Sequence, residues 1–396
     1  MFLLIVLFLG IFIPDQVIKS HHNGNATFAL GMLMISGFLA GNLVKKVKFP
    51  AITGHILMGI LIGPYALGIV SLKDVSNLQL LNSLALSIIA LTAGGEIRIS
   101  QLKKSIRTIN FILLFQTLVI IFGIIASIMV YNIFFPIFDQ GSLGIILALG
   151  ILLGIVSTAS SPSTTLAVII ESKKKNYYTD IILSIVMIKD IVILLLFTLG
   201  LSLSSTLINR TAFDPSVMLT PFLQIIGAIS VGLLIGGLIV MYLRFIKKNS
   251  IVFILTVSFF SYEIFEPLHL HPLLIMMIAG FIVENFSREG DELVKNLESV
   301  SPPVYIIFFT LTGAAINLNY LKSLWLLTFF IVFIRLAYLQ LGTRIGGAIA
   351  KEDCLVRKRL WMGFVSQAGL SLGMAKIIET SFGEIGNQIS VLIISV

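Results

Sequence analysis

Long apolar runs separated by short charged loops dominate this chain of 396 residues. Hydrophobic residues make up 57% of it and charged residues 12%, whereas roughly a quarter of a soluble domain is charged. A helix needs about 20 apolar residues to cross a bilayer, and such runs recur throughout. Because lipid offers the backbone no hydrogen-bond partners, each run is expected to be helical. The sequence therefore predicts an all-α polytopic membrane protein.

The apolar runs predict about 13–14 transmembrane helices. They lie near residues 2–18, 27–44, 53–70, 79–97, 108–134, 144–170, 179–205, 218–243, 251–266, 270–286, 303–318, 324–349, 360–382 and from 388 onward. The first run lacks a basic start and a small-residue cleavage site, so we expect a retained helix, with a secretory signal as the alternative. The last run reaches Val396, which leaves room for a cytoplasmic regulatory domain beyond it.

Lysine and arginine gather in alternate loops, and this alternation predicts the orientation. The rich loops lie at residues 45–48, 98–107, 173–175, 244–248 and 351–359. By the positive-inside rule these loops are cytoplasmic, as is the N-terminus. The net charge of +8 is thus explained by loops between apolar segments, and nucleic acid is not an expected partner.

Two of the runs contain polar interruptions. The run at 144–170 contains STASSPSTT, in which seven of nine residues carry hydroxyls and Pro162 lacks a backbone donor. The run at 360–382 contains SQAGLSLG, which includes Gln367 and Gly369. Non-helical backbone at membrane depth is tolerated where it is buried in protein or lines a watery cavity. Close helix packing through small residues is the alternative explanation.

The interruptions occupy matching positions, each in the fifth of six runs on either side of a linking helix at 218–243. Paired broken helices indicate an inverted-repeat transporter with its site near the midplane. We therefore expect two discontinuous helices that cross. The expected organisation is an N-terminal hydrophobic helix and loop at 1–26, a first repeat at 27–205, a linker at 206–250 and a second repeat at 251–396.

Three charged residues lie deep within apolar runs: Lys189, Asp190 and Arg335. Charges at that depth are costly and by default indicate a functional site. A dehydrated Na⁺ or K⁺ needs several oxygen ligands, which Asp190 could share with nearby hydroxyls and carbonyls freed by the interruption. Opposed helix ends at the second interruption would balance charge there. The candidate ligands of a transported cation are Asp190, Thr158, Ser160, Ser161, Ser163 and Thr164.

Five stretches add a further signal. They are FPAITGHILMGILIGPYALGIV, LTAGGEIRISQLKK, SSPSTTLAVIIESKKKNYYTDIILSIVMIKD, FFTLTGAAINL and GFVSQAGLSLGMA. In sequence and order they resemble the membrane domain of the cation:proton antiporter superfamily, the sodium/hydrogen exchanger type, nearest its bacterial second branch. The resemblance covers residues 27–396, and its motifs are specific for the fold.

This resemblance implies a homodimer in the inner (cytoplasmic) membrane, with a rigid dimerisation domain and a mobile core that contains two crossed broken helices. It implies exchange of Na⁺, Li⁺ or K⁺ against protons by alternating access. Asp190 would bind the cation, and Arg335 would take the place of the basic residue on the facing core helix. A carboxylate that holds either a proton or a cation, but not both, is sufficient to couple the two flows.

Lys189 departs from the family pattern, in which Asp, Asn or Gln usually precedes the binding acid. Three interpretations stay open: a proton carrier that deprotonates when the cation arrives, a structural countercharge, or a built-in cation that abolishes ordinary transport. Neighbours on a helix point about 100° apart, so Lys189 need not pair well with Asp190.

The sequence contains no enzyme signature and calls for no cofactor: it has no phosphate-binding glycine loop, no nucleophile elbow and no metal cluster. Its one cysteine, Cys354, excludes a disulfide within the chain. Three classes of function remain: a proton-coupled antiporter, a gated K⁺ efflux pathway, and a transport-dead membrane sensor. Flux that requires protons would identify the first class, uncoupled flux the second, and no flux the third.

Overall fold

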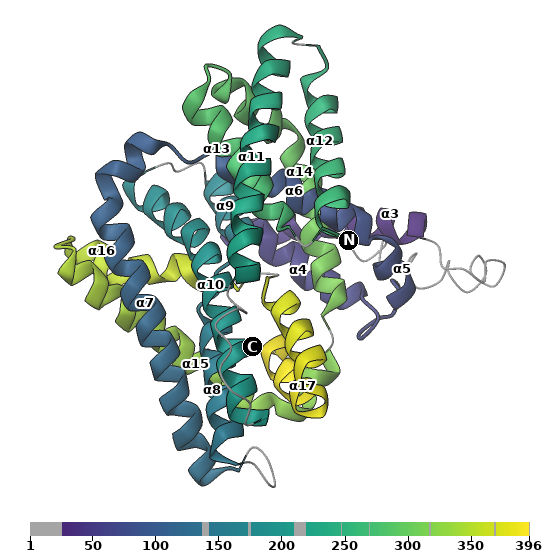
Figure 1. Cartoon of the computed structure of the whole chain (residues 1–396). Coiled ribbons are helices and arrows are strands. Elements are labelled where there is room, and N and C mark those ends of the chain that lie inside the picture. The colour runs from purple at the N-terminus through teal and green to yellow at the C-terminus, as the bar shows by residue number, and fades with distance from the viewer. Residues whose placement is uncertain are drawn as a thin grey trace. The chain divides into compact units, whose positions relative to one another are not determined.

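The computed structural model describes most of the chain (Figure 1). The described residues are 26–136, 142–172, 176–209, 219–246, 248–268, 270–316, 318–367 and 370–395. The predicted first helix at 2–18 and the basic loop at 173–175 lie outside these ranges, as does Gly369.

The described residues form helices and no strand, which confirms the all-α prediction. Within the described residues, six helical segments are long and apolar enough to cross a membrane: Ala26–Lys46, Leu102–Phe134, Leu143–Ser172, Tyr177–Ile208, Phe222–Phe245 and Trp325–Ile349. Four shorter apolar helices are Ala51–Ile62, Gln79–Gly95, Ser250–Phe265 and Pro272–Phe286. These helices coincide with predicted runs, so hydropathy alone located most of the elements.

The chain divides into two compact units, which interleave along the sequence. Unit 1 comprises Met1–Arg98, Leu166–Lys173 and Ala228–Asn319, and unit 2 comprises Ile99–Thr165, Lys174–Gly227 and Tyr320–Val396. Each unit therefore combines helices from both predicted repeats. The repeat boundaries themselves stay a prediction.

Unit 1 is built mainly from short helices that pack backbone to backbone. They are α3 (Ala26–Lys46), α4 (Ala51–Ile62), α5 (Leu72–Asn77), α6 (Gln79–Gly95), α12 (Ser250–Phe265), α13 (Pro272–Phe286), α14 (Gly290–Ala315) and most of α11 (Leu219–Phe245). In α6, a Cβ on Gly94 would overlap the carbonyl oxygen of Met277 in α13. Conversely, a Cβ on Gly280 would overlap the carbonyl oxygen of Leu91. Small residues thus let the two helices approach closely, as they do between many membrane helices.

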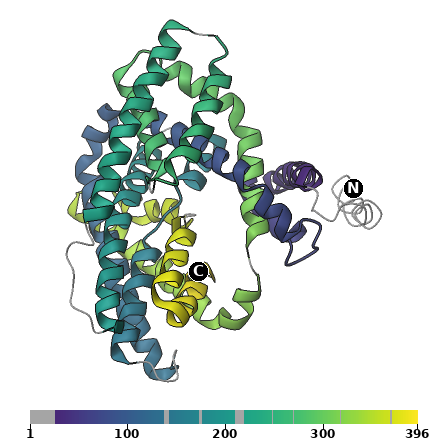
Figure 2. The same cartoon turned by 45° about the vertical axis from the view of Figure 1, so that its right-hand side comes forward.

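Stacked aromatic rings join α11 to α12. The rings of Tyr242 and Phe253 are parallel, with centroids 3.7 Å apart. Both views show these green helices side by side (Figures 1 and 2). Asn249, between them, adopts a left-handed conformation with φ of 51°, which turns the chain into α12.

Unit 2 contains the longest helices and both interruptions. Its elements are α7 (Ile99–Phe134), α8 (Leu143–Ser157), α10 (Tyr177–Asn209), α15 (Leu318–Ile349), α16 (Cys354–Arg359), η3 (Leu360–Phe364) and α17 (Leu370–Ser395). The helix α9 (Pro162–Ser172) begins in this unit. Within α17, the yellow helix of Figure 2, Gly383 has φ 57° and ψ −125°. This kink divides α17 close to the boundary that the sequence predicts between the last two runs.

The close approach of α6 and α13 gives a first prediction. Gly94→Val should lower the free energy of unfolding by about 1–3 kcal/mol, because overpacking forces the two backbones apart. Gly31→Ala, in α3, is the control, since a Cβ there meets nothing within 4 Å. The check is the melting temperature of each purified variant in detergent. Equal melting temperatures for the two variants would contradict this packing.

Candidate functional site

The first interruption separates α8 from α9. The helix α8 ends at Ser157 and α9 begins at Pro162, so residues 158–161 link two half-helices. Proline suits the first position of a helix, where its missing N–H would have no partner. The side chain of Ser161 then caps α9 by accepting a hydrogen bond from the backbone N–H of Thr164 (3.1 Å). The predicted break therefore arises because one helix ends at Ser157 and a new, capped helix begins at Pro162.

The second interruption separates η3 from α17, and it meets the first. The backbone N–H of Ser161 donates to the carbonyl of Ser366 (2.8 Å). The hydroxyl of Ser160 donates to the carbonyl of Phe364 (3.2 Å). These bonds satisfy backbone groups that a continuous helix would have paired internally. The two discontinuous segments thus contact one another directly, as the prediction of crossing helices requires.

Arg335, on α15, binds the backbone carbonyls that the interruptions leave open. Its Nε donates to the carbonyl of Ser157 (2.8 Å), one terminal nitrogen to that of Ala159 (2.9 Å) and the other to that of Val365 (2.8 Å). The residue is only 4% exposed. Because a helix C-terminus carries partial negative charge, a buried guanidinium is favourable at the end of α8.

Lys189, on α10, is fully buried and makes no salt bridge with a described residue. Its ammonium donates to Gln116 Oε1 (2.7 Å) and to Ser160 Oγ (3.4 Å). The Nζ atom also lies 4.8 Å from the centre of the Phe364 ring, within the range of a cation–π interaction. Its described partners are therefore neutral groups from α7, from η3 and from the link between α8 and α9, not the neighbouring Asp190.

Gln116, on α7, and its partner Thr343, on α15, were not among the site residues predicted from the sequence. Gln116 is fully buried, and its amide nitrogen donates to Thr343 Oγ1 (2.6 Å). The available signal was the amide of Gln116 in the apolar run FILLFQTLVIIF. An uncharged polar residue is a weak signal, because membrane helices often use such residues to bond to one another.

Asp190 has a buried carboxylate oxygen, Oδ1, that accepts no hydrogen bond from a described residue. Buried polar atoms are nearly always paired, so each exception calls for an explanation. At the second interruption, the amide oxygen of Gln367 is likewise buried and accepts no hydrogen bond from a described residue. The Gln367 amide nitrogen donates to Ser371 (3.1 Å). These oxygens have the chemistry that a proton or a dehydrated cation would satisfy.

The predicted hydroxyl ligands lie at the first interruption, but several are engaged locally. Thr158 donates to the carbonyl of Ile155 (2.6 Å), and Thr164 donates to Ser161 Oγ (3.0 Å). Ser163 is half-buried in the first turn of α9. Their role as cation ligands stays a prediction.

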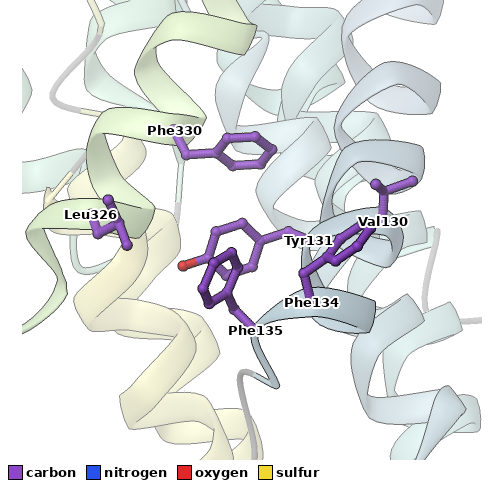
Figure 3. Close-up of a pocket in the computed structure, with 6 residues that line it drawn as sticks. All are labelled: Val130, Tyr131, Phe134, Phe135, Leu326 and Phe330. Carbon is purple, nitrogen blue, oxygen red and sulfur yellow. The ribbon is translucent and has the colours of Figure 1, made fainter.

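Two cavities lie elsewhere. In unit 1, a cavity of about 220 Å³ includes Lys45 and Glu171, which form a salt bridge (3.2 Å). Both Glu171 oxygens accept from the backbone N–H of Ala51, at 3.0 and 2.8 Å, at the start of α4. In unit 2, an aromatic cavity of about 320 Å³ is lined by the ends of α7 and α15 (Figure 3). Its residues are Val130, Tyr131, Phe134, Phe135, Leu326 and Phe330, and this lining offers an ion almost no ligands.

A chain of apolar helices in which two interrupted segments meet beside buried charges belongs to the class of membrane transporters. Residues 2–394 match the protein family described as "Sodium/hydrogen exchanger, transmembrane", and the chain belongs to that family. It is a transporter family and not an enzyme family.

Individual relatives agree with this assignment. The chain is 26% identical over 302 residues to "Probable Na(+)/H(+) antiporter 3" of Methanocaldococcus jannaschii, which covers 72% of this chain and 71% of that protein. Two solved structures of the sodium proton antiporter MjNhaP1 from the same organism have TM-scores of 0.62 and 0.68, each at 17% identity. They cover 93% of this chain and 92% and 93% of theirs. At that identity the likeness shows the fold.

The three carbonyls bound by Arg335 give a second prediction. Arg335→Gln should lower the free energy of unfolding by about 3 kcal/mol or more, because each buried carbonyl left unpaired costs about 1–3 kcal/mol. Arg335→Lys should lie between this variant and the native chain, since an ammonium cannot reproduce the planar guanidinium. The measurement is the melting temperature in detergent. The control is Arg344→Gln, an exposed arginine on the same helix, and an equal loss from it would contradict the assignment.

Proposed function

We propose that this chain exchanges a monovalent cation, Na⁺ or K⁺, for protons by alternating access, with Asp190 as the shared binding group. Family membership supports cation:proton antiport. The observation that carries the assignment of the site is the buried Oδ1 of Asp190, which accepts no hydrogen bond from a described residue. Such an oxygen can take a proton in one state and a metal ion in the other, and that competition couples the two flows.

In this proposal the interrupted segments supply neutral ligands to complement the carboxylate. The hydroxyl oxygens at 158–164 and the Gln367 amide oxygen are the candidate ligands, while Arg335 binds the carbonyls of Ser157, Ala159 and Val365. The cation would therefore be held mainly by side-chain oxygens. A hard cation such as Na⁺ or K⁺ suits such oxygens, and Asp190 is the candidate ligand that bears charge.

The contacts of Lys189 favour the interpretation as a structural countercharge. Its ammonium is engaged by Gln116, Ser160 and Phe364, so it does not occupy Asp190 as a permanent internal cation would. This leaves the carboxylate available and supports a working antiporter over a transport-dead sensor. Proton coupling distinguishes the antiporter from a gated K⁺ pathway.

Asp190→Asn is the direct test of the site. The substitution keeps the size of the side chain but removes its charge, so cation-driven proton flux should fall to background. The measurement is flux in proteoliposomes with Na⁺, Li⁺ and K⁺ in turn. Asp180→Asn, at the start of the same helix, should retain exchange. Wild-type flux in the Asp190 variant would move the binding site elsewhere.

We also propose that the protein is a homodimer of the inner membrane with its basic loops in the cytoplasm. The one cysteine tests the orientation, because Cys354 is exposed at the start of α16. A membrane-impermeant maleimide should label it only after cells are permeabilised. In the variant Cys354→Ser with Ser142→Cys, the new cysteine is expected outside, at an exposed position before α8, and should react in intact cells. The reverse pattern would invert the topology.

A further inference from the structure

The orientation of the Gln116 side chain is fixed by its partners. The hydroxyl of Thr343 donates its single proton to the carbonyl of Leu339 (2.7 Å), so toward Gln116 it can only accept. The amide nitrogen of Gln116 must therefore face Thr343, and its oxygen must face Lys189. This chain of bonds makes Gln116 Oε1 a dedicated acceptor for the ammonium.

The backbone of Gln116 is also held in place. A Cβ on Gly342, in α15, would lie 2.6 Å from Gln116 Cα and 3.0 Å from the carbonyl oxygen of Phe115. The two helices therefore touch at this residue with no side chain between them. A site built on closely packed helices keeps its geometry better than one on a loop.

The neutral acceptor matters because an ammonium and a transported cation would compete for the same carboxylate. Lys189 and Asp190 are adjacent, and a lysine side chain has four rotatable methylene groups with which to reach another acceptor. Among the described residues, Gln116 accepts the shorter of the two hydrogen bonds from Lys189, 2.7 Å against 3.4 Å for Ser160. Loss of the Gln116 oxygen would remove the main contact that directs the ammonium toward α7.

We propose that Gln116 is a positioning residue for cation binding: oriented by Thr343, it holds the Lys189 ammonium away from Asp190 and leaves that carboxylate free for the transported cation. This inference rests on the proposed function. It assigns to Gln116 no direct contact with the cation, and its effect on affinity must therefore pass through Lys189.

A double-mutant cycle tests this dependence in the full chain. The readout is the rise in melting temperature with NaCl or KCl, at constant ionic strength with choline chloride, because a bound ion stabilises the folded state. Gln116→Leu should raise the half-saturating cation concentration about tenfold, as expected for the loss of one charge-assisted hydrogen bond. In the Lys189→Gln background, the same substitution should leave that concentration nearly unchanged.

Thr343 provides a second pair of variants if Gln116→Leu is too unstable to purify. Thr343→Val removes the acceptor that orients Gln116 and should weaken cation binding in the same direction. Thr343→Ser keeps the hydroxyl and should bind as the native chain does. A change in melting temperature without a change in half-saturation would indicate a structural role only and would overturn the inference.

Two further results would overturn the positioning role of Gln116. An equal loss of affinity with and without Lys189 would mean that Gln116 contacts the cation directly, which overturns the positioning role. No cation-dependent stabilisation of the native chain overturns it as well. The proposed function is judged separately by proton flux in the Asp190→Asn variant, so failure of the positioning role can be distinguished from failure of the proposed function.

Discussion

The hydrogen bonds from Arg335 to three backbone carbonyls are the interaction on which unit 2 depends. An interrupted helix in a membrane exposes carbonyls that lipid cannot satisfy, at a cost of several kcal/mol each. A buried guanidinium without acceptors is costlier still. The guanidinium and the carbonyls therefore satisfy one another. The carbonyl of Val365 belongs to one interruption, and those of Ser157 and Ala159 belong to the other. The charge thereby joins the two breaks.

Lys189 applies the same principle with different partners. The attraction within a buried ion pair often does no more than offset the desolvation of the two charges. The Lys189 ammonium instead contacts an amide oxygen, a hydroxyl and an aromatic ring. Unit 2 thus buries two positive side chains without a salt bridge among its described residues. Neutral polar groups stabilise these buried charges, and this accounts for the many polar groups around the interruptions.

Much of the fold could be predicted because the bilayer limits the structures that a spanning segment can adopt. Apolar run lengths located most helices, and the motif around Pro162 identified the first break from the chemistry of one residue. The charges Lys189, Asp190 and Arg335 were evident because they lie deep within their runs, whereas Asp180 and Arg344 lie nearer the ends. The second break was harder, since SQAGLSLG contains no proline and small residues also serve packing.

The partners of these charges could not be predicted in the same way. Gln116 is separated from Lys189 by 73 residues and Thr343 from Gln116 by 227. Such pairs depend on which faces of α7, α10 and α15 meet, and helical periodicity is uninformative when a segment is apolar on all sides. Helix geometry indicated that Lys189 need not pair with Asp190, but it could not identify Gln116, Ser160 and Phe364 as the groups that contact the ammonium.

The charge balance explains why a neutral residue at position 116 suits the proposed exchange. Two unit charges about 4 Å apart interact by about 4 kcal/mol at an effective dielectric of 20, so an ammonium free to approach Asp190 would neutralise the carboxylate and repel an arriving cation. A carboxylate at position 116 would hold Lys189 firmly, but it would also add a second buried acid able to bind cations or protons. An amide oxygen binds the ammonium without either consequence. In the proposed mechanism, the availability of the carboxylate to the cation therefore depends on a residue that carries no charge.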